Sequence, residues 1–275
     1  MKTVLFVLVF FFLVLSEALK GQTFSTRDTL VFGVFPYLNV EESYQYWKMV
    51  LSVVSKEIQK NFEIKVYHGY GEFLNAFLSE SFDLAIVPPP YVVIGFKRKK
   101  YSPLIKNKNL TSAVIIVLKD SNINDLRDLH NVTVVTLYPG TFADIYSRLF
   151  LMEHYKIRFH LKYVNTPENV IKHLLIGSAK AGVVSRENFI IQEDRVKKNF
   201  KIIHQSPEIS SRAIVAHSTI PPEIRKAFVR SFTSLSERED LREALTKIQL
   251  PYPVPANYKD YKKLEAYNVE KYLSW

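Results

Sequence analysis

Three short segments place tyrosine, threonine or proline side chains directly after an apolar run. They are Pro36-Tyr37, 88–91 with the letters PPPY, and 138–141 with the letters YPGT. The third segment suits an anion: at the start of a helix, Gly140 and Thr141 offer backbone N–H groups, a hydroxyl and the positive end of the helix dipole. Tyr37 and Tyr91 could each donate a hydroxyl or form a cleft wall. A small anion is therefore the ligand that these residues predict, although Thr141 as a plain N-cap and the tyrosines as packed aromatics are the structural alternatives.

Residue patterns that support catalysis or metal binding are missing from the sequence. The chain has no cysteine, no His-Glu-x-x-His, no P-loop and no Gly-x-Ser-x-Gly. Its seven histidines are scattered, and His154 and His160 have no acidic residue at ligand spacing. Catalytic groups can also assemble in space from distant positions. We predict a protein that is not an enzyme and that uses no cofactor and no metal.

The N-terminus predicts export. A charged start at Lys2 precedes an apolar run over 4–15 and small residues near Ala18, which is the pattern of a secretory signal peptide. We expect cleavage near Ala18 and a periplasmic location, and the lack of cysteine leaves no acceptor for a lipoprotein anchor. The formal charge of +10 is spread along the chain, and its densest run, 97–100, is interpreted as a solvated face. A nucleic-acid partner is not predicted.

Hydrophobic periodicity predicts strands that alternate with helices, and this pattern occurs twice. Such alternation favours mainly parallel sheets with helices on both faces, and its repetition favours two α/β lobes. The predicted domains are a signal peptide at 1–18, the first part of lobe 1 at 24–110, lobe 2 at 111–211, and a return to lobe 1 at 212–275. The predicted strands span 30–35, 62–67, 83–87, 111–118, 132–137, 161–164 and 181–184, with extended segments at 201–204 and 213–217. The predicted helices span 43–60 (capped by Ser43), 71–78, 124–129, 142–154, 167–176, 221–235, 237–248 and 258–272.

The order of these motifs resembles the phosphate/phosphite/phosphonate solute-binding family. Residues 32–37, the helix that carries Trp47, and Tyr70 ahead of 73–77 are similar to the start of its first lobe. The run 83–91 is similar to a strand followed by its Gly-Pro-x-x-Tyr loop. The runs 114–121, 126–129 and 169–177 follow in the order of its hinge strand, the helix that opens its second lobe, and a later helix that ends in glycine. The resemblance covers about 30–232.

The resemblance implies a two-lobed type II periplasmic binding protein that clamps its ligand between the lobes and delivers it to an ABC-transporter permease. It implies Tyr70, Pro89, Tyr91 and Thr141 as ligand contacts, to which the loop positions of Tyr37 and Gly140 are added. The chain departs from the family at Pro88, which replaces the loop glycine, and near Pro167 and at Lys180, where relatives that bind phosphonates place a histidine and an acid. From the missing acid we expect that the protein does not bind an aminophosphonate.

Two alternatives remain open at this stage. A freestanding pair of lobes could report its ligand to a membrane sensor rather than to a permease. The ligand could also be a sulfonate or a thiamine precursor, which related type II proteins bind. We expect a monomer in each case.

Overall fold

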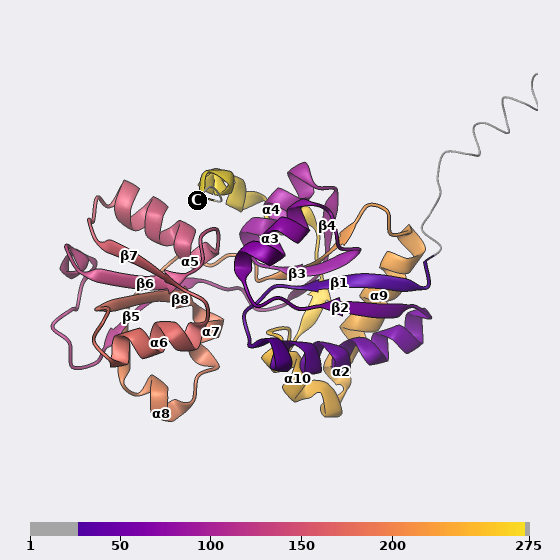
Figure 1. The fold of residues 1–275 in the computed structure, drawn as a ribbon, viewed down its shortest axis with the longest axis horizontal. Coiled ribbons are helices and arrows are strands. Elements are labelled where there is room, and N and C mark those ends of the chain that lie inside the picture. The colour runs from indigo at the N-terminus through magenta and orange to yellow at the C-terminus, as the bar shows by residue number, and fades with distance from the viewer. Residues whose placement is uncertain (1–26, 273–275) are drawn as a thin grey trace, which may run out of the picture.

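The computed structural model describes residues 27–272, so the predicted signal peptide lies outside the described residues. Two α/β lobes lie side by side along the long axis of the molecule (Figure 1). Lobe 1 is built on a six-stranded sheet and lobe 2 on a five-stranded sheet. The repeated strand–helix pattern of the sequence therefore corresponds to two separate sheets.

The lobe 1 sheet has the strand order β11-β4-β10-β3-β1-β2. Strands β1, β2 and β3 pair in parallel, and β10, β4 and β11 continue the sheet in antiparallel pairs. Helices α3 and α4 cover one face, and α2, α9 and α10 cover the other (Figure 1). The bounds are β1 Thr29–Val34, α2 Val40–Ile58, β2 Asn61–Lys65, α3 Tyr70–Leu78, β3 Leu84–Val87, α4 Pro89–Arg98, β4 Tyr101–Asn107, β10 Ala213–His217, α9 Pro222–Ser234, α10 Arg242–Lys247 and β11 Pro253–Pro255.

The lobe 2 sheet has the strand order β7-β6-β8-β5-β9. Strand β6 pairs in parallel with β7 and β8, while β5 pairs antiparallel with β8 and β9. The bounds are β5 Ala113–Leu118, η1 Leu126–Leu129, β6 Thr133–Leu137, α5 Phe142–Ile145, η2 Tyr146–His154, β7 His160–Val164, α6 Pro167–Leu175, β8 Ala181–Ser185, α7 Arg186–Ile190, α8 Asp194–Lys197 and β9 Phe200–Gln205. The predicted helix over 142–154 is thus a short α-helix that continues in π-helical register.

The chain crosses between the lobes twice, and the two crossing segments are hydrogen-bonded to each other. The backbones of Thr111 and Ile209 exchange two N–H···O bonds of 2.8 Å. The hydroxyl of Ser206 accepts from the Ala113 N–H at 2.9 Å, and that of Ser211 accepts from the Asn107 N–H at 3.0 Å. Paired crossings of this kind form a hinge about which the lobes can rotate.

The C-terminal turns of the described chain contact both lobes. Residues 258–272 form three short 3₁₀ helices, η5 Tyr258–Asp260, η6 Lys262–Tyr267 and η7 Val269–Tyr272, rather than the predicted single helix. On lobe 1, Glu270 forms an ion pair with Arg98. On lobe 2, the Lys271 ammonium lies 2.8 Å from the Glu153 carboxylate, and the Tyr272 carbonyl accepts from Arg148 at 2.6 Å. We call residues 262–272 the C-terminal strap.

Two local details of lobe 1 differ from the sequence predictions. Helix α2 begins at Val40 because the Asn39 side chain caps it by accepting the Glu42 N–H at 2.9 Å, whereas Ser43 lies buried within the helix. The prolines at 88–90 do end a strand, but Pro89 also begins α4, because proline fits the first turn of a helix, where its missing N–H is not needed. The basic run 97–100 closes that helix, and β4 follows it although no strand was predicted there.

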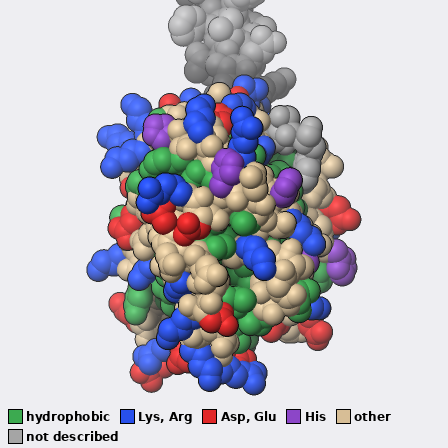
Figure 2. All heavy atoms as spheres, turned by 90° about the vertical axis from the view of Figure 1, so that its left-hand side faces the viewer, with side chains coloured by type: hydrophobic (Ala, Val, Ile, Leu, Met, Phe, Trp, Pro, Cys, Tyr) green, Lys and Arg blue, Asp and Glu red, His purple; other side chains and the backbone are tan. Residues whose placement is uncertain are grey.

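Charged side chains do not gather into a single basic surface on the face of lobe 2 seen in Figure 2, where Lys and Arg alternate with Asp and Glu. Among the described residues, no helix combines the length and apolar character needed to span a membrane.

Candidate ligand-binding site

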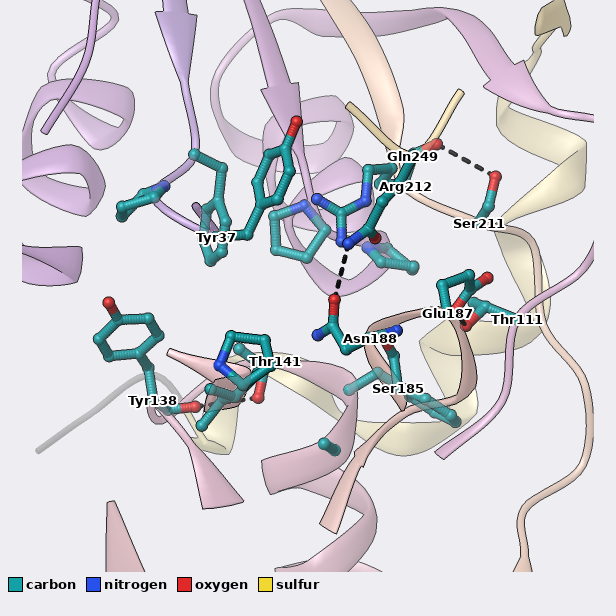
Figure 3. Close-up of a pocket in the computed structure, with 18 of the residues that line it drawn as sticks. Tyr37, Thr111, Tyr138, Thr141, Ser185, Glu187, Asn188, Ser211, Arg212 and Gln249 are labelled. Atoms are coloured by element: carbon teal, nitrogen blue, oxygen red, sulfur yellow. Dashed lines mark hydrogen bonds between the residues drawn. The ribbon is translucent and has the colours of Figure 1, made fainter. Parts of the chain in front are cut away.

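A cavity of about 60 Å³ lies between the lobes, at the carboxyl ends of strands from both sheets (Figure 3). Because a space of about 10–15 Å³ holds one water-sized group, the cavity accommodates about four to six such groups. Loops after β1, β3, β6, β7 and β8 form most of its wall, together with the two crossings. The lining residues are Phe35, Pro36, Tyr37, Pro88, Pro89, Thr111, Leu137, Tyr138, Thr141, Phe142, Ala143, Asn165, Pro167, Ser185, Glu187, Asn188, Ser211, Arg212 and Gln249.

Arg212 brings a positive charge to the cavity from the return crossing. Its guanidinium carbon lies 4.2 Å from the centre of the Tyr37 ring. Within residues 27–272, the guanidinium donates no hydrogen bond and forms no ion pair, and burial lowers its pKa. Arginine carries five N–H donors in a planar fork that matches an oxyanion, and a desolvated guanidinium without an acceptor is costly. The arrangement therefore favours an anionic ligand.

Glu187 lies in the same polar end of the cavity, at the start of α7. One of its carboxylate oxygens accepts a hydrogen bond from the Thr111 hydroxyl, and the other is buried with no partner among the described residues. Burial raises the pKa of Glu187, against the opposing effects of the Thr111 bond and the Arg212 charge. Glu187 and Arg212 both line the cavity without forming an ion pair with each other. A group placed between them can meet a cation on one side and a carboxyl on the other.

The start of α5 forms the opposite, mainly apolar end of the cavity. Thr141 caps the helix: its hydroxyl donates to the Tyr138 carbonyl at 3.0 Å and accepts the Asp144 N–H at 3.3 Å. The backbone N–H groups of Phe142 and Ala143 have no partner in the described part of the chain. First-turn N–H groups of a helix are suited to an anion or to water. Directly behind them, the buried Asp144 carboxylate makes an ion pair with Arg148, and burial raises the pKa of Asp144.

The lobes contact each other around the cavity, so the structure is in a closed form. Tyr138 of lobe 2 stacks on Tyr70 of lobe 1 with ring centres 4.4 Å apart. The Gln249 amide of lobe 1 donates to the Asn188 side-chain oxygen of lobe 2 at 2.7 Å (Figure 3). A ligand in the cavity is therefore enclosed by both lobes at once.

The structure places three of the six predicted contact residues in the cavity wall: Tyr37, Pro89 and Thr141. Tyr37 contributes its ring, since its hydroxyl donates to the Ile248 carbonyl at 3.2 Å. The other three predicted contacts, Tyr70, Tyr91 and Gly140, are not among the lining residues.

The positions of Tyr70, Tyr91 and Gly140 have simple physical reasons. Tyr70 and Tyr91 are buried in lobe 1 and hydrogen-bonded to each other through their hydroxyls. Helix α4 begins at Pro89, and this turns Tyr91 into the core instead of leaving it on a loop. Gly140 has a positive φ of 84°, and its N–H donates to the Asp144 carboxylate at 2.7 Å, so that N–H is not free for a ligand.

Sequence reasoning missed the charged and amide groups of the cavity. Ser185, Glu187 and Asn188 follow β8 directly, so the rule that ligands lie beyond the carboxyl ends of strands could have found them. Arg212 could have been noticed as a lone charge between two serines and an apolar strand at a crossing. Gln249 carries no such sequence signal.

The cavity contains a carboxyl group, although position 180, where relatives that bind phosphonates carry an acid, is a lysine in this chain. Lys180 precedes β8 at its amino end and is exposed, so it does not line the cavity, whereas Glu187 does. Pro167 does line the cavity. No cluster of three or more histidine, cysteine or acidic side chains suited to a metal occurs within residues 27–272.

Two lobes, paired crossings and an interlobe cavity at the strand ends are the features of a solute-binding protein. The family description "ABC transporter, phosphonate, periplasmic substrate-binding protein" matches residues 32–261. This match spans most of the chain, and the chain belongs to that family of periplasmic substrate-binding proteins of ABC transporters. The family is one of transport proteins and not of enzymes. No curated protein matches the sequence.

Solved structures of low sequence identity share the fold. PhnD1 from Prochlorococcus marinus, in complex with methylphosphonate, is 14% identical over 89% of this chain and 98% of its own, with a TM-score of 0.77. XAC2383 from Xanthomonas citri, bound to chloride ion, is 13% identical over 90% of this chain and 99% of its own, with a TM-score of 0.74. A binding-protein component of an ABC phosphonate transporter from Pseudomonas aeruginosa is 13% identical over 88% of this chain and 86% of its own, with a TM-score of 0.72. These likenesses confirm the type II periplasmic binding protein fold.

Proposed function

We propose that this protein captures a small oxyanion, a phosphonate or a close relative, in the interlobe cavity and delivers it to an ABC-transporter permease. The observation that carries the ligand class is the Arg212 guanidinium, which lines the cavity with no acceptor of its own among the described residues. The first-turn N–H groups of Phe142 and Ala143, which have no partner among the described residues, can donate to the same anion. The family membership supports the phosphonate class.

The size of the cavity supports a small ligand over a large one. Space for about four to six water-sized groups suits a tetrahedral anion with one short substituent, such as methylphosphonate. Closing contacts around the cavity, above all between Tyr70 and Tyr138, leave little room for an extended chain in this form of the protein. For the same reason we expect 2-aminoethylphosphonate to bind no more tightly than methylphosphonate.

Titration calorimetry on protein stripped of ligand by unfolding and refolding tests the proposal. The panel comprises methylphosphonate, phosphite, phosphate, 2-aminoethylphosphonate, sulfate and thiamine. Micromolar or tighter binding of methylphosphonate, phosphite or phosphate supports the oxyanion class. Thermal unfolding provides a second measurement, because a ligand that binds only the folded state raises the unfolding temperature. If only thiamine binds, or if no anion raises the unfolding temperature at millimolar concentration, the proposal is wrong.

Two finer features belong to the same proposal. Export by a cleaved signal peptide, with cleavage near Ala18, is supported by the N-terminal sequence and by the periplasmic location of the family. We also propose that the protein is a monomer. Mass spectrometry of the secreted protein identifies the mature N-terminus, and light scattering during size-exclusion chromatography measures the oligomeric state.

A further inference from the structure

We propose that the C-terminal strap is a latch, which stays with lobe 1 when the lobes open and attaches to lobe 2 when they close. The strap, at the yellow end of the chain in Figure 1, lies between α4 of lobe 1 and lobe 2. A latch in this place sets how long a ligand remains enclosed. This consequence rests on the proposed function, since it concerns release from the interlobe cavity, whereas the movement of the strap itself does not.

The segment just before the strap is fixed to lobe 1 and to the return crossing. The buried Tyr261 hydroxyl donates to the Ser211 carbonyl at 2.9 Å. The Ser210 hydroxyl donates to the Asp260 carbonyl at 2.9 Å, and the Asp260 carboxylate lies 2.9 Å from the Lys106 ammonium of β4. Opening of the lobes leaves these contacts in place, because all the groups involved belong to lobe 1 or to the hinge.

The strap itself packs along α4 of lobe 1. Leu264 is buried, and both η6 and η7 contact α4. The Glu265 carboxylate lies 3.2 Å from the Lys97 ammonium, and Glu270 accepts from Nε of Arg98 at 3.0 Å. Separating the strap from α4 would expose apolar surface as well as break these ion pairs, so we expect the strap to move with lobe 1.

The contacts of the strap with lobe 2 can separate without leaving a buried charge unpaired. The ion pair of Lys271 with Glu153 joins side chains that are 53% and 42% exposed, and such pairs contribute little. Arg148 donates to the Tyr272 carbonyl at 2.6 Å, and its guanidinium lies 4.7 Å from the centre of the Tyr272 ring. When Tyr272 leaves, Arg148 keeps its ion pair with the buried Asp144. The strap therefore detaches more easily from lobe 2 than from lobe 1.

On lobe 2 the strap reaches a residue of the ligand cavity. The Tyr267 ring packs against the rings of Phe142 and Phe150, with ring centres 5.9 and 5.4 Å away. Phe142 begins α5 and lines the cavity, and its N–H has no partner within the described residues. A ligand at the start of α5 and the strap thus contact the same residue, and each stabilises the closed arrangement that the other needs.

Crosslinking tests whether the strap must leave lobe 2 before a ligand can escape. The chain has no cysteine, so the substitutions Glu153→Cys and Lys271→Cys supply its only two thiols, which a short bis-maleimide can join. Release of radiolabelled methylphosphonate is measured after dilution into unlabelled ligand. We expect the crosslink to slow release at least about tenfold relative to the same protein before crosslinking, which corresponds to about 1.4 kcal/mol added to the barrier for opening.

The matched control joins the strap to lobe 1 through the substitutions Arg98→Cys and Glu270→Cys. This pair likewise replaces one ion pair of the strap by a covalent link, but on the side where the strap stays during opening. We expect crosslinking to leave the release rate of this control unchanged.

A variant without a crosslink tests the opposite direction. Glu153→Ala removes the acceptor of both the Lys271 ammonium and the Tyr272 hydroxyl, so release should become about twofold to fivefold faster, as expected for an exposed ion pair. The control is Glu168→Ala, which removes an exposed acid of lobe 2 at the start of α6 and should leave the release rate unchanged.

The other outcomes overturn the latch, each in its own way. Slower release in both crosslinked proteins means that the strap is a fixed bridge, and unchanged release in both means that it follows either lobe freely. Slower release in the control alone means that it stays with lobe 2. If methylphosphonate does not bind the uncrosslinked protein, the proposed function fails by itself. Small-angle X-ray scattering of the ligand-free protein then tests the latch: compaction by the lobe 2 crosslink alone supports it, and equal scattering from both crosslinked proteins refutes it.

Discussion

Replacing Arg212 by methionine should weaken ligand binding and, in the absence of ligand, stabilise the protein. The two effects have opposite signs because the Arg212 guanidinium has no hydrogen-bond acceptor in the ligand-free protein, whereas it binds the anion in the complex. Methionine has a similar length and can keep contact with the Tyr37 ring. A residue that only supports the fold would not produce this opposition.

The expected magnitudes follow from the contacts of the side chain. Two charged hydrogen bonds to the anion contribute about 1.5–3 kcal/mol each, so their loss weakens binding by roughly 10²–10⁴-fold. Without ligand, the unsatisfied guanidinium lowers the free energy of unfolding by about 1–3 kcal/mol, and its contact with the Tyr37 ring raises it by about 0.5–1 kcal/mol. We expect a net gain of about 1 kcal/mol, which for a protein of this size raises Tm by about 2–4 °C.

Calorimetric titration with methylphosphonate and thermal unfolding of ligand-free protein measure the two effects. The control is Arg225→Met, since the Arg225 guanidinium donates to the carbonyls of Ile220 at 2.7 Å and Ser218 at 2.8 Å, away from the cavity. That variant should lose stability and keep its affinity. Wild-type affinity in Arg212→Met, or a loss of stability similar to that of the control, would refute the assignment of Arg212 as the anion contact.

Three other predictions concern closure, pH and the C-terminal strap. The variant Gln249→Ala removes the interlobe hydrogen bond to Asn188, which contributes about 1 kcal/mol to closure. Calorimetry should therefore show about fivefold weaker ligand binding. Unchanged affinity would contradict a role of this hydrogen bond in closure. Burial raises the pKa of Glu187, so the unfolding free energy of the ligand-free protein should fall as pH rises above the ordinary glutamate pKa of about 4.3. Denaturant titrations of Glu187→Gln should show a smaller fall. Deleting residues 262–275 removes the contacts of the C-terminal strap with both lobes. This deletion should lower Tm and speed ligand release in stopped-flow measurements. Equal release rates would contradict the idea that the strap restrains opening of the lobes.

The sequence was most informative where one physical signal dominates. The apolar face of α2, with Trp47, Val50 and Leu51, is buried as its 3.6-residue spacing predicted. The apolar runs at β1, β3, β6 and β8 form the centres of the two sheets, since strands buried on both faces must be continuously hydrophobic. Prediction failed where local signals compete: in β4 a proline and a lysine interrupt the apolar pattern, and pairing with β10 decides its conformation.

The sequence by itself determined the alternation of strands and helices, the two lobes and the loops that face the cleft, because hydrophobic spacing and turn residues act over a few neighbours. It also placed Tyr37, Pro89 and Thr141 in those loops. Only the tertiary structure decided which side chains meet there. It brought Arg212 from the return crossing and Gln249 from the segment after α10 to Glu187 and Asn188 at the end of β8. The same contacts bury Tyr70 and Tyr91 in the core of lobe 1. Charge pairing and burial depend on contacts between residues far apart in the chain, and no local pattern records them.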